Sequence, residues 1–327
     1  MLDLSIVTIN FNTSDATIAC VKSIIEKTTL LYYEIVIIDN ASESDDYLNL
    51  EKQVKKLDLP NVKLVRSNIN TGFGTGNMIG YAETSPSKYV TFINNDVELI
   101  DDCFPILKSY LDNNLDVGVV SPQSVNEHLD FVPTIDHFAS WQREIFTRKV
   151  LEIVNSKRYP KRKKAYTEPV VADFIAGSFM FVRREDFDKV GGFDKNIFLY
   201  YEETDLSRRM KGIGQKTVLI STIQYKHYHG LSTKKSIAIK LEQKLSLIYV
   251  VKKHQGWLAS KVLLIYFGVK YFFSTLISPK KWTLLKATLK GMPMSLSLKF
   301  KQKTKEIYIK MICAFATKMC FLESVDF

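Results

Sequence analysis

Apolar runs alternate with helical patterns through the first third of the chain, and this alternation restricts the fold more than any other feature. Alternation of this kind indicates a mostly parallel sheet with helices on both faces, so we expect an α/β fold. The apolar runs occupy residues 4–11, 32–39, 62–67 and 89–94, and stretches of helical spacing follow them at 15–27, 44–57, 77–84 and 101–112.

The composition is typical of a globular protein in a reducing compartment. The chain has 327 residues, of which 46% are hydrophobic and 24% charged, enough for one large domain with an appendage or for two modest domains. Its cysteines, Cys20, Cys103, Cys313 and Cys320, form no C-x-x-C pair, which argues against a zinc site or a disulfide scaffold. The first apolar run follows no basic segment, so we expect no signal peptide and a cytoplasmic protein.

Polar side chains end each of the four apolar runs. Any one of them is typical of a helix cap or a turn. In an open α/β sheet, however, ligands bind beyond the carboxyl ends of the strands, so four polar ends together predict a binding site there. These side chains are Asn10 and Asn12, Asp39 and Asn40, Ser67 to Asn70, and Asn94, Asn95 and Asp96.

The glycine-rich stretch NTGFGTGNMIG at residues 70–80 follows the third apolar run. It fails the dinucleotide fingerprint G-x-G-x-x-G, because Asn77 holds the third glycine position and the stretch does not lie in the first strand-to-helix turn. A P-loop is excluded as well, since no Gly-Lys-Ser/Thr follows. We interpret the stretch as a tight turn in which glycine allows positive φ and close helix packing.

Asp96 lies just past the fourth apolar run, in FINNDVEL at residues 92–99. A carboxylate with amide neighbours at a strand end can hold Mg²⁺ or Mn²⁺, because these cations take a few oxygen ligands from the protein and others from a bound diphosphate. On its own this signal is weak.

The segment at residues 172–214 combines small side chains at 176–178, a Gly-Gly-Phe-Asp turn, an aromatic run and a group of acids. The acids, Glu202, Glu203 and Asp205, also suit the N-terminus of a helix, where carboxylates complement the dipole. For Asp205 we expect a structural ion pair with Arg209 four residues later.

In order and spacing, six segments resemble the family 2 glycosyltransferases of GT-A fold, and within them the rhamnosyltransferase-like branch that builds bacterial surface polysaccharides. The segments are SIVTINFN, IVIIDNAS, NTGFGTGN, FINNDVEL, the block from GSFMFVRRE through GGFD to YYEETDL, and HYHGLS. The resemblance runs from about Leu4 to Thr233. It implies a GT-A domain at 1–233, with a nucleotide-binding half at 1–122 and an acceptor and catalytic half at 123–233, followed by a basic, amphipathic helical region at 234–327.

The resemblance implies contacts to a nucleotide-sugar. Asp39 matches the acid that accepts from the pyrimidine N3–H of a UDP- or dTDP-sugar, and the edge from Thr8 to Asn10 lines the nucleotide. Asn70 and Gly72 match residues that lie against the nucleotide.

The resemblance also implies a metal site for Mg²⁺ or Mn²⁺. Asp96 stands at the metal-binding acid of the family's DxD motif, with Asn94 and Asn95 beside the nucleotide-sugar. His227 matches the position of a second metal or diphosphate contact, and His229 competes with it for that role.

For the catalytic base, the resemblance points to the pair Glu202-Glu203. Glu203 occupies the base position, with Glu202 as the fallback. Either carboxylate can remove the proton of an acceptor hydroxyl as that oxygen attacks the anomeric carbon, with inversion expected.

The chain departs from the family pattern at three positions. Asn94 replaces the first acid of DxD, and Glu203 replaces the usual aspartate. Met78 stands where the branch often has a second asparagine. Two residues earlier, Gly76 is expected to let the next helix pack closely.

The C-terminal part is both apolar and basic. WLASKVLLIYFGVKYFFSTLI at 257–277 precedes a region, 278–327, with ten lysines and three acids. Because Lys261 and Lys270 interrupt the apolar stretch, we expect a helix that lies on a membrane surface. A transmembrane span and a buried helical hairpin are the alternatives, since periodicity cannot separate them.

A second basic region, 156–167, has six basic residues between Lys157 and Lys164. Such a run is usually a solvated loop. The alternative is that it faces a polyprenyl diphosphate acceptor, whose phosphates would attract it.

Together these features predict a metal-dependent, inverting glycosyltransferase, peripheral at the inner face of the cell membrane. It would transfer rhamnose or another hexose from a dTDP- or UDP-sugar to a polyprenyl-diphosphate-linked glycan. A non-catalytic nucleotide-sugar or glycan-binding protein of the same fold is the alternative, suggested by Asn94 and Glu203.

Two other classes fit less well. A nucleotidyltransferase would need a glycine-rich, basic loop in the first strand-to-helix turn, and NFNTSDAT has neither glycine nor a basic residue. Nucleic-acid binding by the basic tail lacks an accompanying motif, so we expect no nucleic-acid partner.

Overall fold

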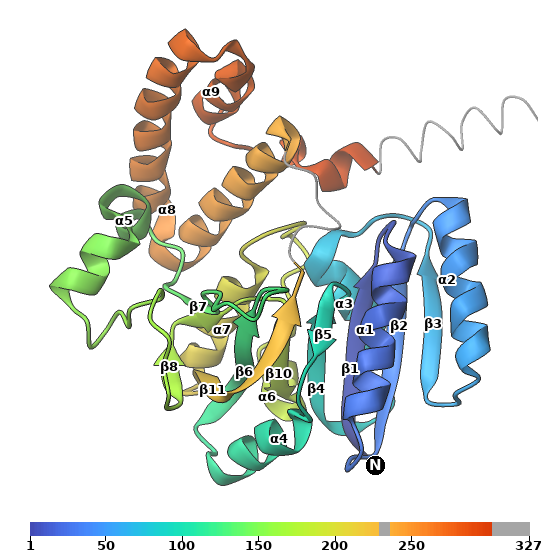
Figure 1. The fold of residues 1–327 in the computed structure, drawn as a ribbon. Helices are drawn as coiled ribbons and strands as arrows, with labels where there is room; N and C mark the ends of the chain where they lie inside the picture. The colour runs from blue at the N-terminus through green and yellow to red at the C-terminus, as the bar shows by residue number, and fades with distance from the viewer. Residues whose placement is uncertain (229–235, 303–327) are drawn as a thin grey trace, which may run out of the picture.

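The computed structural model describes residues 1–228 and 236–302, and it confirms the expected α/β fold (Figure 1). Four parallel strands make one half of the central sheet, in the order β3-β2-β1-β4. The strands are β1 (Leu2–Asn10), β2 (Tyr33–Asn40), β3 (Val62–Ser67) and β4 (Ser87–Asn94), and the helices are α1 (Ser14–Lys27), α2 (Ser44–Leu57), α3 (Gly72–Ala82) and α4 (Phe104–Asn113).

The other half of the sheet has mixed strand directions. β10 (Phe179–Arg183) lies antiparallel between β4 and β6 (Val117–Val125), and β11 (Lys216–His227) runs parallel to β6. β8 (Val170–Ala172) and β5 (Val97–Leu99) pair with the start and the end of β11. The remaining elements include a small sheet of β7 (Ile135–Asp136) and β9 (Phe174–Ile175), and the helices α5 (Trp141–Val154), α6 (Arg184–Lys189) and α7 (Glu202–Gly212).

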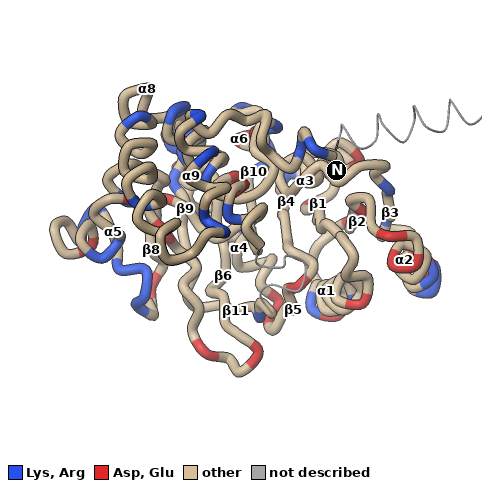
Figure 2. The backbone as a smooth tube through the Cα atoms, turned by 90° about the horizontal axis from the view of Figure 1, so that it is seen from above, with Lys and Arg blue, Asp and Glu red and all other residues tan. Residues whose placement is uncertain are grey.

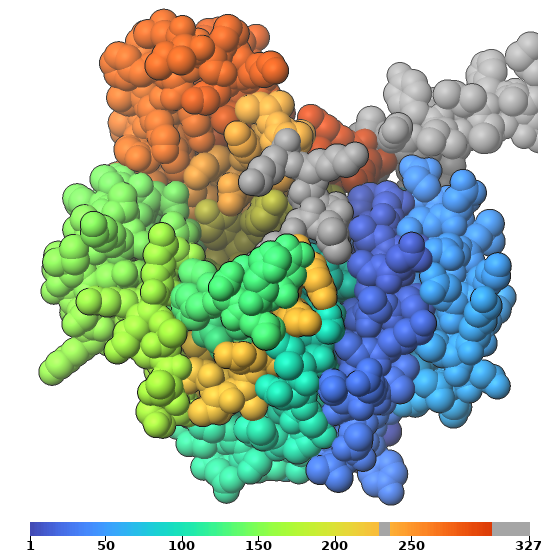
Figure 3. Space-filling model, viewed as in Figure 1, coloured from blue at the N-terminus to red at the C-terminus, as the bar shows by residue number. Residues whose placement is uncertain are grey.

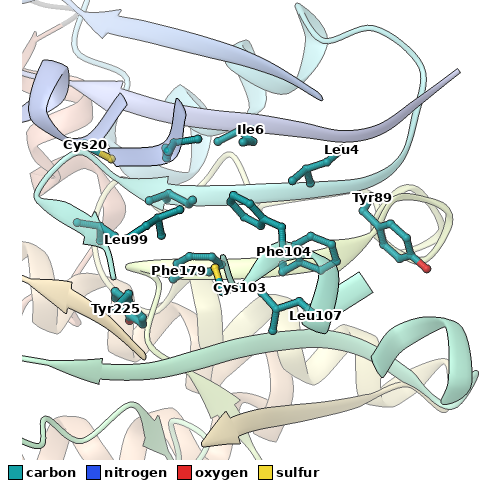
Figure 4. Packing of buried hydrophobic residues seen from close by; sticks show 14 of the residues in the cluster. Leu4, Ile6, Cys20, Tyr89, Leu99, Cys103, Phe104, Leu107, Phe179 and Tyr225 are labelled. Carbon is teal, nitrogen blue, oxygen red and sulfur yellow. The ribbon is translucent and has the colours of Figure 1, made fainter. Parts of the chain in front are cut away.

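The sheet is buried on both faces, which explains why its strands are continuous apolar runs. Ile6 faces the cluster covered by α1, α2 and α4, and its neighbour Val7 faces the opposite cluster, with Phe187 of α6 and Leu206 of α7. Figure 4 shows the first cluster, in which Phe104 of α4 packs near Phe179 of β10. Burial on this scale is the main stabilising contribution to the fold.

The prediction that the glycine-rich stretch is a turn is wrong for most of its length, because α3 already begins at Gly72. Glycine is a poor helix former, but close packing outweighs that preference here. Gly72 has φ +80°, and a Cβ there would lie 2.0 Å from the Phe198 carbonyl oxygen. At Gly76 a Cβ would lie 2.9 Å from Ile9 Cδ1, which confirms the expected packing role of this glycine.

The C-terminal helices form a lobe beside α5 (Figure 3). α8 (Ile237–Ile277) bends at Gly256, where φ is 87° and ψ is 175°. Beyond the bend, Leu263 and Phe267 pack in one cluster with Leu284 and Leu285 of α9 (Trp282–Leu289). The two helices therefore form a hairpin that projects away from the sheet.

One face of the second half of α8 is apolar and open to solvent. By length and composition, α8 is the one helix among the described residues that could cross a membrane. Of its most apolar stretch of 18 residues, 22% is buried. The structure leaves this face exposed, and its placement on a membrane surface stays a prediction. The face consists of Leu258, Ile265, Val269, Phe272 and Leu276, at helical spacing and between 55% and 73% exposed.

The predicted domain boundaries coincide with no gap in the fold. The division at 122 and 123 falls inside β6, which pairs with both β10 and β11. The two halves are therefore parts of one sheet, and their separate roles stay a prediction. The boundary after residue 233 lies outside the described residues.

Candidate active site

The strand order reverses at β1, because β2 and β3 lie on one side of it and β4 on the other. Open α/β sheets bind ligands at such a switch point. The register places Asn10 beside Asp39, and Ile9 beside Asn94. The polar strand ends therefore share one edge of the sheet, the upper edge in Figure 1.

Asp39 is fully buried, and its carboxylate is paired within the protein. Its Oδ1 accepts from Asn10 Nδ2 at 3.0 Å, and its Oδ2 accepts from the Ser42 N–H at 3.3 Å. Arg66 Nε lies 3.5 Å from Oδ2, and the half-exposed guanidinium stacks 3.9 Å from the Tyr47 ring centroid. The Asp39 side chain is 0% exposed, so its contact with a nucleotide stays a prediction.

Asn10, expected to line the nucleotide, is fully buried, and its amide donates to Asp39, Ser42 and Asp46. Two further residues expected there also lie beneath the surface. Thr8 is fully buried, and its hydroxyl has no hydrogen-bond partner among residues 1–228 and 236–302. Asn95 donates to Oγ1 of Thr13 at 2.7 Å and of Thr17 at 2.8 Å, which ties the end of β4 to α1. The Thr8 hydroxyl does not reach the open edge because it is covered, and the Asn95 amide does not because it is hydrogen-bonded to α1.

Asn40 holds the glycine-rich segment against β2. Its Oδ1 accepts from the N–H and the hydroxyl of Thr71, both at 3.0 Å, and its Nδ2 donates to Asn70 Oδ1 at 3.1 Å. Asn70 Oδ1 in turn accepts from the Gly72 N–H at 2.9 Å. Asn70 and Gly72 thus shape the loop. Asn40 was predicted to lie at the binding edge as one of the polar strand ends, but it was given no individual role.

Asp96 and His227, the predicted metal ligands, come together across 131 residues of sequence. His227 Nε2 lies 3.1 Å from Asp96 Oδ1, and the residues are 7% and 9% exposed. In the part of the chain that the structure describes, no group of three His, Cys, Asp or Glu side chains is placed to hold a metal. The pair suits Mg²⁺ or Mn²⁺ that completes its coordination with phosphate oxygens. His229 lies outside the described residues.

A break between β9 and β10 brings small side chains to the same edge. The Ser178 carbonyl accepts from the Asn94 N–H at 2.9 Å, so residues 176–178 lie beside the end of β4. Asn94 is partly exposed there. Ala176 also lines the pocket that contains Glu203, so this short segment joins the Asn94 edge to that pocket.

The two glutamates at the start of α7 lie in different surroundings. Glu202 is 2% exposed and packs under α3, where a Cβ on Gly74 would lie 3.3 Å from its Cγ. Glu203 is partly exposed and lines the pocket. Burial, together with the charge of Glu203, raises the pKa of Glu202 well above its usual value. Burial also raises the pKa of Glu203, against the opposing charge of Arg143.

The backbone before α7 is strained. Tyr200 and Tyr201 have φ of 70° and 73°, in the left-handed region that bulky residues avoid. Each such residue costs about 1–3 kcal/mol, and strain of this kind concentrates at functional sites. Both tyrosines line the same pocket as Glu203.

The pocket around Glu203 has a volume of about 200 Å³ and is rich in charged side chains. Two of its arginines lie on α5, where no motif singled them out, and the third lies in the basic region at 156–167. Lining residues include Asp136, Arg143, Arg148, Arg162, Tyr200, Tyr201, Glu203 and Gln243. The basic region is thus not wholly solvated.

The structural ion pair expected for Asp205 is confirmed. Arg209 Nη2 lies 2.8 Å from Asp205 Oδ2, while His254 Nε2 and Lys253 Nζ of α8 each lie 2.7 Å from Oδ1. Burial alone would raise the pKa of Asp205, but His254, Arg209 and Lys253 outweigh it and lower the pKa to about 2. This network fixes α8 to α7, so Asp205 serves packing rather than chemistry.

Comparison with known proteins identifies the family of this chain. Residues 5–191 match the family described as Glycosyl transferase family 2, a match that ends before Glu202. An N-acetylglucosaminyl-diphospho-decaprenol L-rhamnosyltransferase of Mycobacterium tuberculosis is 26% identical over 223 residues, which is 61% of this chain and 69% of the relative. The rhamnosyltransferase WbbL of Escherichia coli is 34% identical over 102 residues, 31% of this chain and 38% of the relative.

A solved structure shares the fold. The crystal structure of GalNAc-T7 with UDP, GalNAc and Mn²⁺ superposes with a TM-score of 0.63 at 17% sequence identity, over 96% of this chain. This chain spans 58% of the length of that protein. The expected GT-A fold is therefore confirmed. The fold, the family match and the two kinds of rhamnosyltransferase relative together show that this chain belongs to glycosyl transferase family 2, in its rhamnosyltransferase-like branch.

Proposed function

We propose that this protein is an inverting glycosyltransferase that moves rhamnose or another hexose from a dTDP- or UDP-sugar to a polyprenyl-diphosphate-linked glycan of a bacterial surface polysaccharide. One observation carries the proposal: the pocket of Glu203 joins the Asn94 edge through residues 176–178. The proposed base, Glu203, would then lie near the strand ends that we expect to bind the nucleotide-sugar. The name of the Mycobacterium tuberculosis relative, with its diphospho-decaprenol acceptor, supports the acceptor class.

In the proposed reaction, Glu203 takes the proton of an acceptor hydroxyl as that oxygen attacks the anomeric carbon. The bond from the anomeric carbon to the acceptor oxygen forms while the bond to the diphosphate oxygen breaks on the opposite face, which inverts the centre. The proton ends on Glu203. Burial raises the pKa of Glu203, which makes the carboxylate a stronger proton acceptor once it is ionised.

Asp96 and His227 would hold Mg²⁺ or Mn²⁺ beside the donor diphosphate. Bound there, the cation would supply positive charge to the leaving diphosphate. With Asn94 in place of an acid, the DxD position offers one carboxylate, so we expect affinity for the metal to depend on the bound nucleotide-sugar.

We also propose that the protein binds peripherally to the inner face of the cell membrane through the apolar face of α8. Charge supports this, since Lys and Arg gather over α8, α9 and the chain after α5 (Figure 2). Apolar insertion combined with lysines near anionic headgroups is the usual basis of interfacial binding. The lysines of the hairpin are Lys261, Lys270, Lys280, Lys281, Lys286 and Lys290.

A donor screen tests the activity. Nucleotide release would be measured with dTDP-rhamnose, UDP-galactose and UDP-glucose, with acceptor-containing membranes, for the wild type and Asp96→Ala. We expect one donor to be used, and expect chelation of divalent metal or Asp96→Ala to abolish its use. Asp101→Ala, which removes an exposed carboxylate five positions further on, is the control and should keep full activity. Equal activity of Asp96→Ala and wild type would overturn the proposal.

A further inference from the structure

The pocket beside Glu203 is lined by three arginines and by two carboxylates, Asp136 and Glu203 itself. Asp136 is the shared partner of three arginines: Arg148 Nε donates to its two oxygens at 2.7 and 2.8 Å, Arg162 Nε lies 3.6 Å away and Arg143 Nη1 4.0 Å away. Glu144 balances Arg143 at 3.0 Å, and among the contacts of the described residues Arg148 and Arg162 pair with Asp136 alone, although Glu203 lines the same pocket. Burial would raise the pKa of Asp136, but Arg148 and Arg143 outweigh it and lower it.

Several guanidinium donors of the pocket are unused. Each guanidinium has five N–H donors. Within the described residues, Arg148 uses only Nε, and the buried Nε of Arg162 has no hydrogen-bond partner. The Arg148 side chain is 38% exposed and that of Arg162 27%, so a ligand with several acceptor oxygens can reach their remaining donors. Phosphate groups match this fork geometry best.

The position of the pocket favours the acceptor over the donor as the source of these phosphates. Gln243 of α8 lines the pocket, and the same helix continues into the exposed apolar face that begins at Leu258. The candidate donor edge, with Asp39 and Asp96, lies at the ends of β2 and β4 instead. A volume of about 200 Å³ is below the ~300–1,000 Å³ of typical small-molecule sites, so the pocket suits part of a ligand.

We propose that Arg148 and Arg162 bind the diphosphate that joins the acceptor sugar to its lipid, and thereby place the acceptor hydroxyl at Glu203. This assignment rests on the proposed function, because it presupposes a lipid-diphosphate acceptor. The acceptor would then approach from the side of the α8 hairpin and the donor from the β1 and β4 edge, with Glu203 between them.

Direct binding of farnesyl diphosphate tests the assignment without transfer. Calorimetric titrations would use the full chain with saturating UDP, so that the donor site is filled. We expect the wild type to bind, and the double variant Arg148→Gln/Arg162→Gln to bind roughly tenfold or more weakly, the usual range for losing charged hydrogen bonds. Lys161→Gln removes an exposed charge from the same loop, outside the pocket, and should bind as the wild type does.

Two results would overturn the assignment. Equal binding by the wild type and the double variant would show that the arginines do not bind the diphosphate. Competition between UDP and farnesyl diphosphate would show that both bind at the donor edge. Should the glutamine variant unfold early, Arg148→Lys/Arg162→Lys keeps the charge and should bind with intermediate affinity, because lysine lacks the planar fork.

Kinetics separate this inference from the proposed function. In transfer assays, the double variant should raise the KM for the lipid-linked acceptor and leave the donor KM and acceptor-free donor hydrolysis unchanged. If no donor is transferred but farnesyl diphosphate still binds through the arginines, the phosphate site stands and the proposed function falls.

Discussion

At the scale of single residues, Glu202 shows what burial does to a carboxylate. At a pH between the ordinary glutamate value of about 4.3 and its raised folded value, the folded protein keeps a proton that the unfolded chain releases. Stability therefore falls as the pH rises through this window, and above it the full cost of the buried charge applies. One pKa unit of difference corresponds to about 1.4 kcal/mol.

Glu202→Gln removes that charge, so we predict a more stable protein at neutral pH and little change at acidic pH. Thermal unfolding at about pH 5 and pH 8 measures the effect. Glu26→Gln, at a glutamate that is 73% exposed, is the control and should change neither midpoint. A lower midpoint for Glu202→Gln at pH 8 would show that Glu202 carries a favourable charge.

Residue roles were predicted from sequence with uneven success. The pairing of Asp205 with Arg209 could be predicted because both residues lie on one helix at fixed spacing. The nearness of Asp96 and His227 followed from the family resemblance alone, since 131 residues separate them. The burial of Thr8 and the presence of Arg143 and Arg148 in the pocket could not be predicted, because they depend on how α1 and α5 pack against the sheet.

At the scale of elements, α3 depends on the absence of side chains at its start. Gly72→Ala places a methyl group 2.0 Å from a carbonyl oxygen at a positive φ, so we predict a loss of more than about 1 kcal/mol in the free energy of unfolding. Chemical denaturation measures this. Gly268→Ala, in α8 with no atom within 4 Å of the new Cβ, should be neutral or stabilising by up to about 1 kcal/mol.

The strands and helices of the first half followed from periodicity, because both faces of a parallel sheet are covered and each strand is a continuous apolar run. The start of α3 did not follow, since local propensity disfavours a helix of glycines and the deciding contact, Phe198, lies far away in sequence. Tertiary packing overrode the local preference there.

At the scale of the whole molecule, the α8 hairpin gives the protein a second surface besides the sheet edge. We predict that Ile265→Asp/Phe272→Asp, which places two charges on the apolar face, abolishes flotation with vesicles that contain anionic lipid and leaves the fold intact. Leu115→Asp, at a leucine that is 75% exposed two residues after the end of α4, is the control and should float like the wild type. Unchanged flotation of the double variant would contradict the membrane assignment.

The central claim is that Glu203 removes the acceptor proton at the junction of the donor edge and the acceptor pocket. The most direct test compares kcat/KM for sugar transfer by the wild type, Glu203→Gln and Glu203→Asp under saturating donor. We predict a loss of about 10²–10⁴-fold for Glu203→Gln, with Glu203→Asp retaining more activity because the carboxylate is kept. A Glu203→Gln variant that transfers sugar at the wild-type rate would contradict the account.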